Sequence, residues 1–487
     1  MNYMSSAKLF FTPLFSLAVS VAFSQDYFSY GNSNYGGVLQ LFSNPASAAG
    51  SKLKVDVLLG GFEATFNNSW GAVKKDALSF PNLPDSWKNH TPNVPDNIYK
   101  NFEWQGKNNN KEALLEQRLL LPSVLVRLNS KNSIAFSCSM RQIGNISGIS
   151  PALANLFEKE FDLSVLQNNP VQNKNFSAIR MSWMEYGLTY ARAMGKGAHR
   201  LKAGITPKLL QGLESSYFWL RDLNFLFSNK DTLSYLDVDF TTAHSARTGS
   251  ALDITGNFSD RLSRAAPMRL GLDLGLIYEW HRSPRSTEEN APAEKSNGTA
   301  ASNYKLKAGI ALVDLGKIRF QKEPNYYEMS FSLRQSDIIR YLSAENVHMI
   351  DSLLHHDFPS NTGADNFTVL MPTALNTQLD YALTRRFFLN LSTHLTGFHK
   401  TEFFRVRNYS AVCFSPRYES YWVDAALLFT WQAISAKRGQ RITPGVNLRL
   451  GPLSVGSSDL TFLYKKDLAS LNVYTAIRVS IPYKSKS

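Results

Sequence analysis

Residues 270–280, LGLDLGLIYEW, place an apolar side chain at every second position from Leu270 to Trp280. Asp273 and Glu279 lie in the opposite row. A period of two predicts a β-strand with one apolar and one polar face. The alternation recurs at residues 53–59, 201–206, 304–312, 375–381, 387–395, 421–432, 446–450 and 471–481, with less regular strands expected near 117–129, 132–142, 177–193, 214–228, 231–241, 327–334 and 459–465. The pattern predicts an all-β chain of about fourteen strands, in a range of roughly 12–16.

The length of these strands indicates that the apolar rows face lipid. Many run to ten or more residues, which is the length that crosses a bilayer, whereas strands of soluble proteins average about five or six. Aromatic residues stand at the ends of the rows, as in the girdles of membrane barrels: Tyr278 with Trp280, Tyr304, Tyr381, Tyr421 with Trp431, and Tyr464. We therefore expect a transmembrane antiparallel β-barrel. A secreted multi-domain β protein is the alternative.

The N-terminus predicts export. Residues 1–24 carry one cation, Lys8, then an apolar run that ends in small residues before Gln25, as in a cleaved signal peptide; a membrane anchor is the alternative. After residue 24 no apolar run of 18 residues follows, so a bilayer crossing would need strands. The expected location is the outer membrane of a Gram-negative cell.

The segment 25–52 is the expected lumen or hatch segment, ahead of a barrel over 53–487. Within it Asn44, Pro45 and Ala46 precede the first strand and are the strongest candidates for a functional role. Pro45 fixes its own φ and favours an extended Asn44, while the Asn44 side chain can bond nearby backbone groups. The segment would serve as a fixed plug or as a gate that moves when a ligand enters.

The polar rows predict the lining of the lumen. Their charged members either neutralise one another in a packed interior or form a ligand-binding row. The candidate binding residues are Lys202, Lys208, Asp273, Glu279, Lys305, Lys307 and Arg449, and the same register turns Asp380, Asp424 and Arg478 inward.

Insertions interrupt the strands. Helices are expected near 150–161, where Ser150 caps and Pro151 opens the first turn, and near 336–358, where an apolar stripe repeats at helical spacing. Residues 67–116 and 284–303 read as long loops. These helices and loops would plug the lumen or pack on its rim.

Catalytic patterns are not apparent, so we expect no enzyme, cofactor or metal. His348, His355 and His356 lie close together in sequence but lack a known ligand spacing and read as a solvated helix face. The net charge of +13 comes from interspersed residues without a basic block, which argues against nucleic acid and for anionic lipid headgroups. Cys138 and Cys413, both on expected strands, are either free or joined in one disulfide.

Three stretches resemble a known group of barrels: LQLFSNPASAAGSKLKVDV (39–57), YKLKAGIALVDLGKIRF (304–320) and FTVLMPTALNTQLDYALTRRFFLNL (367–391). The first resembles the Asn-Pro-Ala entry of Bacteroidetes-type outer-membrane barrels, which belong with the long-chain fatty-acid transporter superfamily. The others are similar to an uncharacterised family of that type, a domain of unknown function. The resemblance implies a barrel of about fourteen strands with its N-terminal segment folded into or against the lumen.

Two functions remain open at this point. One is a transporter or channel for small or hydrophobic compounds, with the N-terminal segment as its hatch. The other is a non-transporting interaction barrel, similar to accessory or shuttle barrels of the type IX secretion system, that presents loops to a partner protein. An outer-membrane hydrolase is the weakest alternative.

Overall fold

The computed structural model describes residues 31–69, 71–74, 102–104, 110–158, 168–195, 197–229, 232–245, 265–281, 304–321, 327–333, 366–397, 405–433, 441–465 and 467–482. The elements are, in order, η1 (Gly37–Phe42), η2 (Pro45–Ala48), β1 (Leu53–Asn68), β2 (Gly71–Lys74), β3 (Phe102–Trp104), β4 (Lys111–Arg127), β5 (Asn132–Ile149), α4 (Pro151–Glu158), β6 (Val171–Met194), β7 (His199–Asn229), β8 (Thr232–His244), β9 (Arg269–His281), β10 (Tyr304–Gln321), β11 (Tyr327–Leu333), β12 (Asn366–Leu370), β13 (Ala374–Ala382), β14 (Phe387–Thr396), β15 (Ser410–Glu419), β16 (Val423–Ala433), β17 (Arg441–Leu450), β18 (Leu453–Ser457), α8 (Thr461–Tyr464), β19 (Asp467–Leu468) and β20 (Ser470–Pro482).

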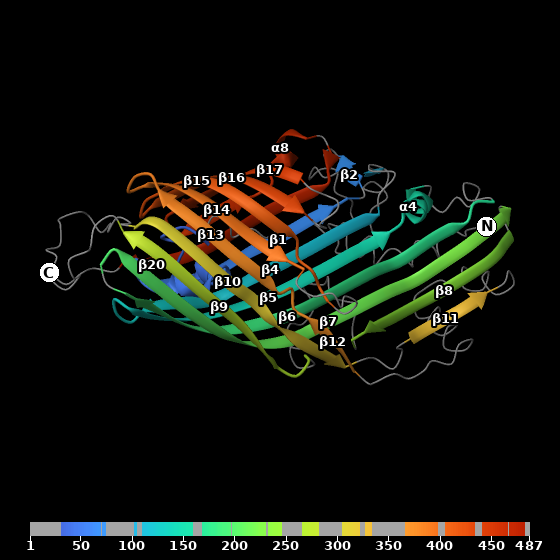
Figure 1. Ribbon diagram of the computed structural model, residues 1–487, viewed down its shortest axis with the longest axis horizontal. Coiled ribbons are helices and arrows are strands. Elements are labelled where there is room, and N and C mark those ends of the chain that lie inside the picture. The colour runs from blue at the N-terminus through green and yellow to red at the C-terminus, as the bar shows by residue number, and fades with distance from the viewer. Residues whose placement is uncertain are drawn as a thin grey trace.

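Fourteen antiparallel strands close into a barrel, as the sequence predicts (Figure 1). The first strand closes it, because β1 pairs with β4 on one side and with the last strand, β20, on the other. Around the wall the order is β1, β4, β5, β6, β7, β9, β10, β13, β14, β15, β16, β17, β18 and β20. Closure pairs the edges that an open sheet would leave unpaired.

The two ends of the barrel differ in their connections. At the end that holds Leu53 and Pro482, five of the six connections are short: 128–131, 195–198, 383–386, 420–422 and 451–452. Residues 282–303 form the sixth and are longer. We call this the short-turn end and the opposite one the long-loop end.

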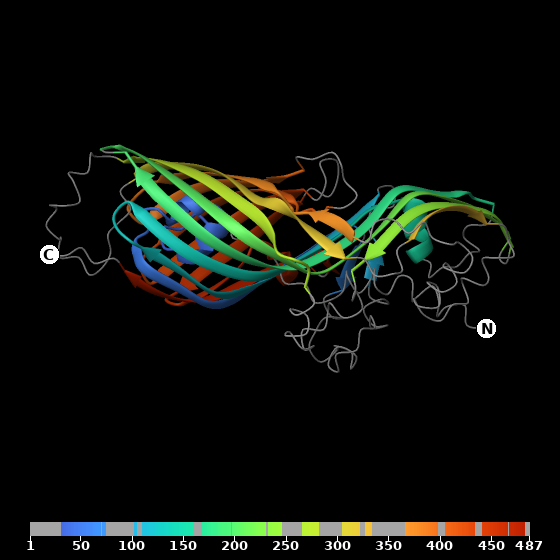
Figure 2. The same cartoon turned by 90° about the horizontal axis from the view of Figure 1, so that it is seen from below.

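One side of the wall continues past the barrel at the long-loop end (Figure 2). The strand β7 spans 31 residues: its first part, 199–210, pairs with β9, and its second, 216–229, pairs with β8. The expectation of separate strands at 201–206 and 214–228 is therefore wrong, since one continuous strand covers both. A further pairing, β8 with β11, widens this extension.

The opening stretch has the predicted orientation. Leu270, Leu274 and Trp280 are 75%, 40% and 44% exposed on the outside of the wall, whereas Asp273 and Glu279 are 2% and 6% exposed. Lipid outside and a filled lumen inside explain the alternation. Tyr304 departs from it: the ring is 3% exposed and points inward, because a register irregularity between positions 304 and 306 resets the alternation.

Two inserted segments have different outcomes. The helix expected near 150–161 is present as α4, whereas the one near 336–358 lies outside the described residues, as do 1–30 and 284–303. A loop over all of 67–116 is wrong, because β1 extends to Asn68, β2 and β3 form a small sheet with β19, and β4 begins at Lys111. Among the described residues, no helix is long and apolar enough to span a membrane.

Candidate functional site in the barrel lumen

Residues 31–50 lie inside the barrel as two short 3-10 helices; we call them the plug (Figure 1). Asn44 begins the second helix in an extended conformation, φ −156° and ψ 112°, and its Oδ1 accepts from the Ala46 amide at 3.0 Å. Its Nδ2 donates to the carbonyls of Leu276 and Ile310, both at 3.3 Å. Asn44 thus caps the plug helix and holds it to β9 and β10. Its extended conformation and its bonds to backbone groups are those expected from the sequence.

Two paired glycines make room for this contact. Gly204 of β7 lies opposite Gly275 of β9. A Cβ at Gly275 would stand 2.1 Å from Asn44 Oδ1, and one at Gly204 would stand 2.4 Å from the Ala46 nitrogen. The plug therefore touches bare backbone of the wall, which only glycine allows at this separation.

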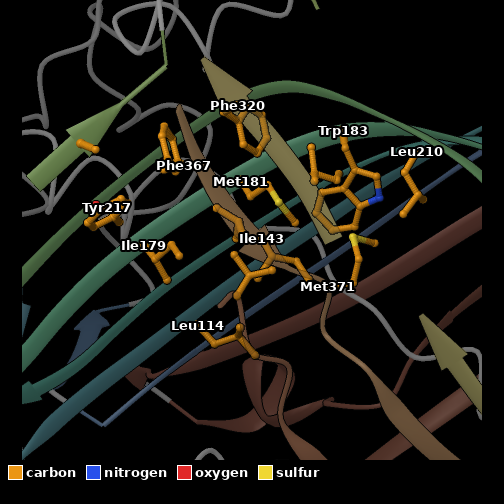
Figure 3. Packing of buried hydrophobic residues seen from close by; sticks show 14 of the residues in the cluster. Leu114, Ile143, Ile179, Met181, Trp183, Leu210, Tyr217, Phe320, Phe367 and Met371 are labelled. Atoms are coloured by element: carbon orange, nitrogen blue, oxygen red, sulfur yellow. The ribbon is translucent and has the colours of Figure 1, made fainter. Parts of the chain in front are cut away.

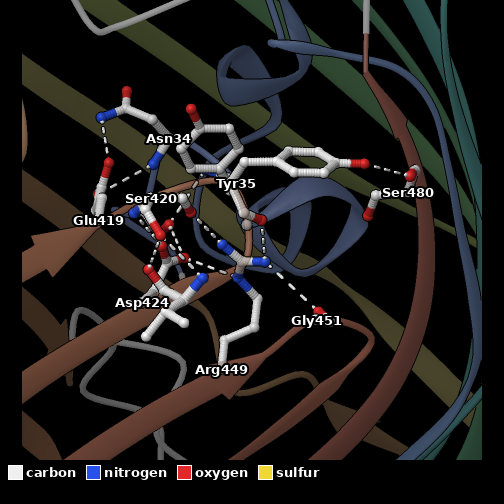
Figure 4. Close-up of polar contacts among 12 residues, drawn as sticks. Asn34, Tyr35, Glu419, Ser420, Asp424, Arg449, Gly451 and Ser480 are labelled. Carbon is white, nitrogen blue, oxygen red and sulfur yellow. Dashed lines mark hydrogen bonds and ion pairs between the residues drawn. The ribbon is translucent and has the colours of Figure 1, made fainter. Parts of the chain in front are cut away.

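Beside β15 and β16, plug residues bond to buried charges (Figure 4). Asn34 Nδ2 donates to Glu419 Oε2 at 2.7 Å, and Ser33 Oγ donates to Asp424 Oδ2 at 2.8 Å. Arg449 Nε donates to the same Asp424 oxygen at 2.9 Å and its Nη2 donates to Ser420 O at 2.7 Å. The hydroxyl of Ser33 in the plug therefore adds a hydrogen bond to the ion pair between Asp424 and Arg449 of the wall.

A second arginine binds the plug backbone directly. Arg478 of β20 donates from Nη1 to Gly36 O at 2.7 Å and from Nη2 to Tyr35 O at 3.0 Å. Its partner Asp56, at 3.1 Å, accepts from the Val38 amide at 2.7 Å. Both side chains are 2% exposed or less. Charge-assisted bonds in such a buried site are strong, so the plug is firmly held.

A third set of charges spans the wall on the long-loop side of the plug. Arg141 Nη1 lies 2.6 Å from Asp314 Oδ2, and its Nη2 lies 3.0 Å from Glu116 Oε1. Lys208 Nζ lies 2.6 Å from Asp273 Oδ2 and 3.0 Å from Asp314 Oδ1. With Arg118 and Glu185, 3.1 Å apart, the cluster holds three cations and four carboxylates, all buried. The charges largely cancel, which agrees with mutual neutralisation, one of the two alternatives that the sequence leaves open.

The predicted lumen residues divide accordingly. Lys208 and Asp273 belong to the wall cluster, Arg449 to the plug contacts, and Lys202 pairs with Glu279 at 2.6 Å. Lys307 Nζ donates to Asn32 O of the plug at 3.0 Å. Lys305 is a correction: its ammonium lies 3.9 Å from the ring centre of Tyr381, in the outward row, because the irregularity that turns Tyr304 inward turns Lys305 outward.

A cavity of about 80 Å³ lies between the plug and the residues before β15. Asn376 Nδ2 donates to Ser43 O of the plug at 2.8 Å, so its Oδ1 accepts from His394 Nδ1 at 2.7 Å. Toward the cavity, three polar atoms have no hydrogen-bond partner in the described part of the chain: His394 Nε2, Gln378 Nε2 and Ser392 Oγ. At roughly 30 Å³ per water the space suits a few waters, and a larger solute would need the plug to move.

An apolar cluster fills the lumen beyond this cavity (Figure 3). After Gly316 the strand β10 continues with β12 as a two-stranded ribbon, 317–321 with 366–370. Its inner face carries Ile318 and Phe320, whose atoms would stand 2.5 Å from a Cβ at Gly212 of β7. The remaining members are Leu114, Ile143, Ile179, Met181, Trp183, Leu210, Tyr217, Ala243, Phe367, Val369, Met371, Val406, Tyr409 and Ala411.

Several site residues escape sequence reasoning. Asp314 has φ 58° and sits in a register irregularity between positions 312 and 315, so simple alternation misplaces it. Three other charged residues lie in strands where apolar and polar positions alternate irregularly: Arg141, Glu116 and Glu185. The only signal for them in the sequence is that charged residues recur in the inward-facing row of these strands. Cys138 of β5 and Cys413 of β15 are free and buried, and no group of metal-ligating side chains occurs among the described residues.

The profile of a protein family, described as "Family of unknown function (DUF5723)", matches residues 45–458. The chain belongs to this family. The family and the fold agree with the resemblance noted from sequence. A search of curated proteins finds no match.

Several solved structures are similar to this DUF5723 chain. A deletion mutant of the TodX monoaromatic hydrocarbon channel has 10% identity and a TM-score of 0.42, covering 96% of this chain and 98% of its own. A FadL homologue of Pseudomonas aeruginosa has 11% identity, a TM-score of 0.37 and coverages of 91% and 93%. The toluene transporter TbuX of Ralstonia pickettii has 9% identity, a TM-score of 0.32 and coverages of 96% and 100%.

Proposed function

We propose that this protein is an outer-membrane transporter for small hydrophobic compounds, seen in its closed state. The observation that carries the proposal is the apolar cluster in the lumen. Trp183, Phe320 and Phe367 face the interior, whereas the interior of a channel for hydrophilic solutes is polar and water-filled. Apolar side chains inside a barrel would suit the passage of an apolar solute once they separate, because such a solute gains free energy by leaving water.

Two elements would have to move during transport. The ribbon of 317–321 and 366–370 packs its apolar face on β5, β6 and β7, and it leaves the wall at Gly316 and at Met371. The plug then closes the short-turn side through Asn44, Arg478 and the paired glycines. The plug acts as a gate in this proposal, and the polar cavity is the wet space between the two barriers.

Deletion of residues 25–37 tests the gate. The shortened protein should remain folded, because the deletion ends before β1 and leaves Asn44 in place, and its conductance in planar bilayers should exceed that of the full chain. Liposomes that contain either protein would then take up a small apolar fluorophore, N-phenyl-1-naphthylamine, at different rates. Equal conductance and equal uptake would show that the segment does not close the route.

Export and membrane location form a separate part of the proposal. The mature chain should begin at or near Gln25, fractionate with outer membranes and show heat-modifiable mobility on a gel. Recovery from the periplasm without detergent would contradict this location.

A second candidate is the non-transporting interaction barrel, with a secretion-system protein as its partner. The filled lumen favours it, since the cavity between plug and apolar cluster holds only about 80 Å³. The two candidates differ in the uptake assay. If the barrel is a transporter, the variant with the shortened plug should let the fluorophore through. If it is an interaction barrel, the apolar cluster should stay packed after the plug is shortened, and the fluorophore should not pass.

A further inference from the structure

At the short-turn end of the described chain, carboxylates lie only on the inside of the wall, whereas cations lie on both sides. Five carboxylates lie near the strand ends here, and each is 6% exposed or less. Their partners are lumen cations: Asp56 with Arg478, Glu279 with Lys202, Asp380 and Glu419 with Arg417, and Asp424 with Arg449. In the described part of this rim, every acidic side chain therefore points inward.

Cations occupy the outer side of the same rim. Five cations are exposed here, and none of them forms an ion pair with a carboxylate of the described chain: Lys54, Lys131, Arg192, Arg385 and Arg386. They come from β1, from the β4–β5 and β13–β14 turns and from the end of β6, so they are spread around the wall. We call these five residues the basic rim.

Aromatic side chains stand beside the basic rim on the outer surface. Tyr190 lies two residues before Arg192 and is 44% exposed, Phe387 follows Arg386 and is 52% exposed, and Trp280 is 44% exposed. Aromatic girdles mark the level of the lipid headgroups, so a cation next to one lies at headgroup height. The long-loop end is different, because carboxylates lie outside the buried interior there: Asp222, 3.9 Å from Lys174, is exposed, and Asp239, which pairs with Arg221, is half-buried.

We propose that the basic rim is a binding surface for anionic phospholipid headgroups, which the protein gathers around its short-turn end. Unpaired cations at the membrane surface attract anionic lipids, and the attraction weakens with salt. The aromatic girdle beside the basic rim favours lipid headgroups over an acidic protein as the partner of these cations. With the aromatic row buried in the bilayer, the cations lie at the level of the headgroups. The inference rests on the membrane-spanning fold and is independent of what the barrel transports.

Spin-labelled lipids test the assignment. The full-length mature protein is reconstituted into phosphatidylcholine bilayers with a trace of spin-labelled phosphatidylglycerol or phosphatidylcholine, and the motionally restricted fraction gives the preference between the two. The wild-type protein should prefer phosphatidylglycerol, and 0.5 M salt should reduce this preference by screening the surface charges, at a Debye length of roughly 4 Å.

The variant K131Q/R192Q/R385Q/R386Q should lose the preference. The control K174Q/K317Q removes two exposed cations from the other end, as many as R385Q/R386Q removes from the basic rim, and should keep the preference. Heat-modifiable mobility checks that both variants fold, and a single-turn variant, R385Q/R386Q, should give an intermediate value if the quadruple variant folds poorly. A wild-type protein without preference, or a control that loses as much as the test variant, would overturn the lipid assignment and leave an acidic protein as the partner of this rim.

Discussion

Replacing Arg478 by methionine should open the barrel. This guanidinium donates to two plug carbonyls, at 2.7 and 3.0 Å, from a side chain that is 2% exposed. A hydrogen bond to a charged group contributes about 1.5–3 kcal/mol, so the two together hold the plug by about 3 kcal/mol at the lower limit. Because every 1.4 kcal/mol is tenfold, loss of both should raise the ratio of open to closed plug roughly a hundredfold.

Arg141→Met is the matched control. Arg141 is also 2% exposed, but its substitution removes two short ion pairs, to Glu116 and Asp314 of the wall, in place of bonds to the plug. Both variants leave a carboxylate without its partner and should lower the free energy of unfolding by about 3–5 kcal/mol. Single-channel recordings in planar bilayers should show longer or more frequent openings for Arg478→Met alone. Equal opening in both variants would mean that general destabilisation, and not the plug contact, controls the conductance.

Three further substitutions test register, fit and packing. Leu274→Arg puts a charge on the outward row and should lower the free energy of unfolding in liposomes by about 2–4 kcal/mol in a urea titration; no loss would place this row outside the hydrocarbon. Gly275→Ala would set a Cβ 2.1 Å from Asn44 Oδ1 and should raise conductance, while Gly60→Ala, with 3.6 Å to the nearest backbone oxygen, should not; matching conductances would refute the close fit of the plug. Phe320→Ala should lower the free energy of unfolding by about 3–5 kcal/mol, and a change below about 1 kcal/mol would show that the apolar cluster is loosely packed.

The outer surface was predictable because lipid imposes a period of two on every strand that touches it. Leu274 and Trp280 face outward, and Asp273 and Glu279 face inward, as their alternation requires. The same rule fails where one strand has an extra residue relative to the strand with which it pairs. Tyr304 turns inward for that reason, after an irregularity that no local composition announces.

The partners inside the lumen could not be predicted from one sequence. Arg141 meets Asp314 across 173 residues of chain, and Arg478 meets the plug at Gly36 across 442. Alternation predicts whether a side chain points inward or outward. It does not predict which inward side chains of other strands it will meet, because that depends on the order and stagger of the strands in the closed barrel. Asn44 is the exception, since its extended backbone and its bond to the Ala46 amide depend on the two residues that follow it.

The ion pair between Asp56 and Arg478 links the order in which the strands of the barrel form to the closing of the lumen. Asp56 belongs to the first strand, Arg478 belongs to the last, and the plug residues between Tyr35 and Val38 bind both. A ribosome makes the plug first, yet the plug lacks this anchor until the final strand has been synthesised and paired. Contacts of such sequence separation form late and slowly. A chain that stalls before β20 would therefore combine an unsealed wall with a plug that lacks its two bonds to Arg478.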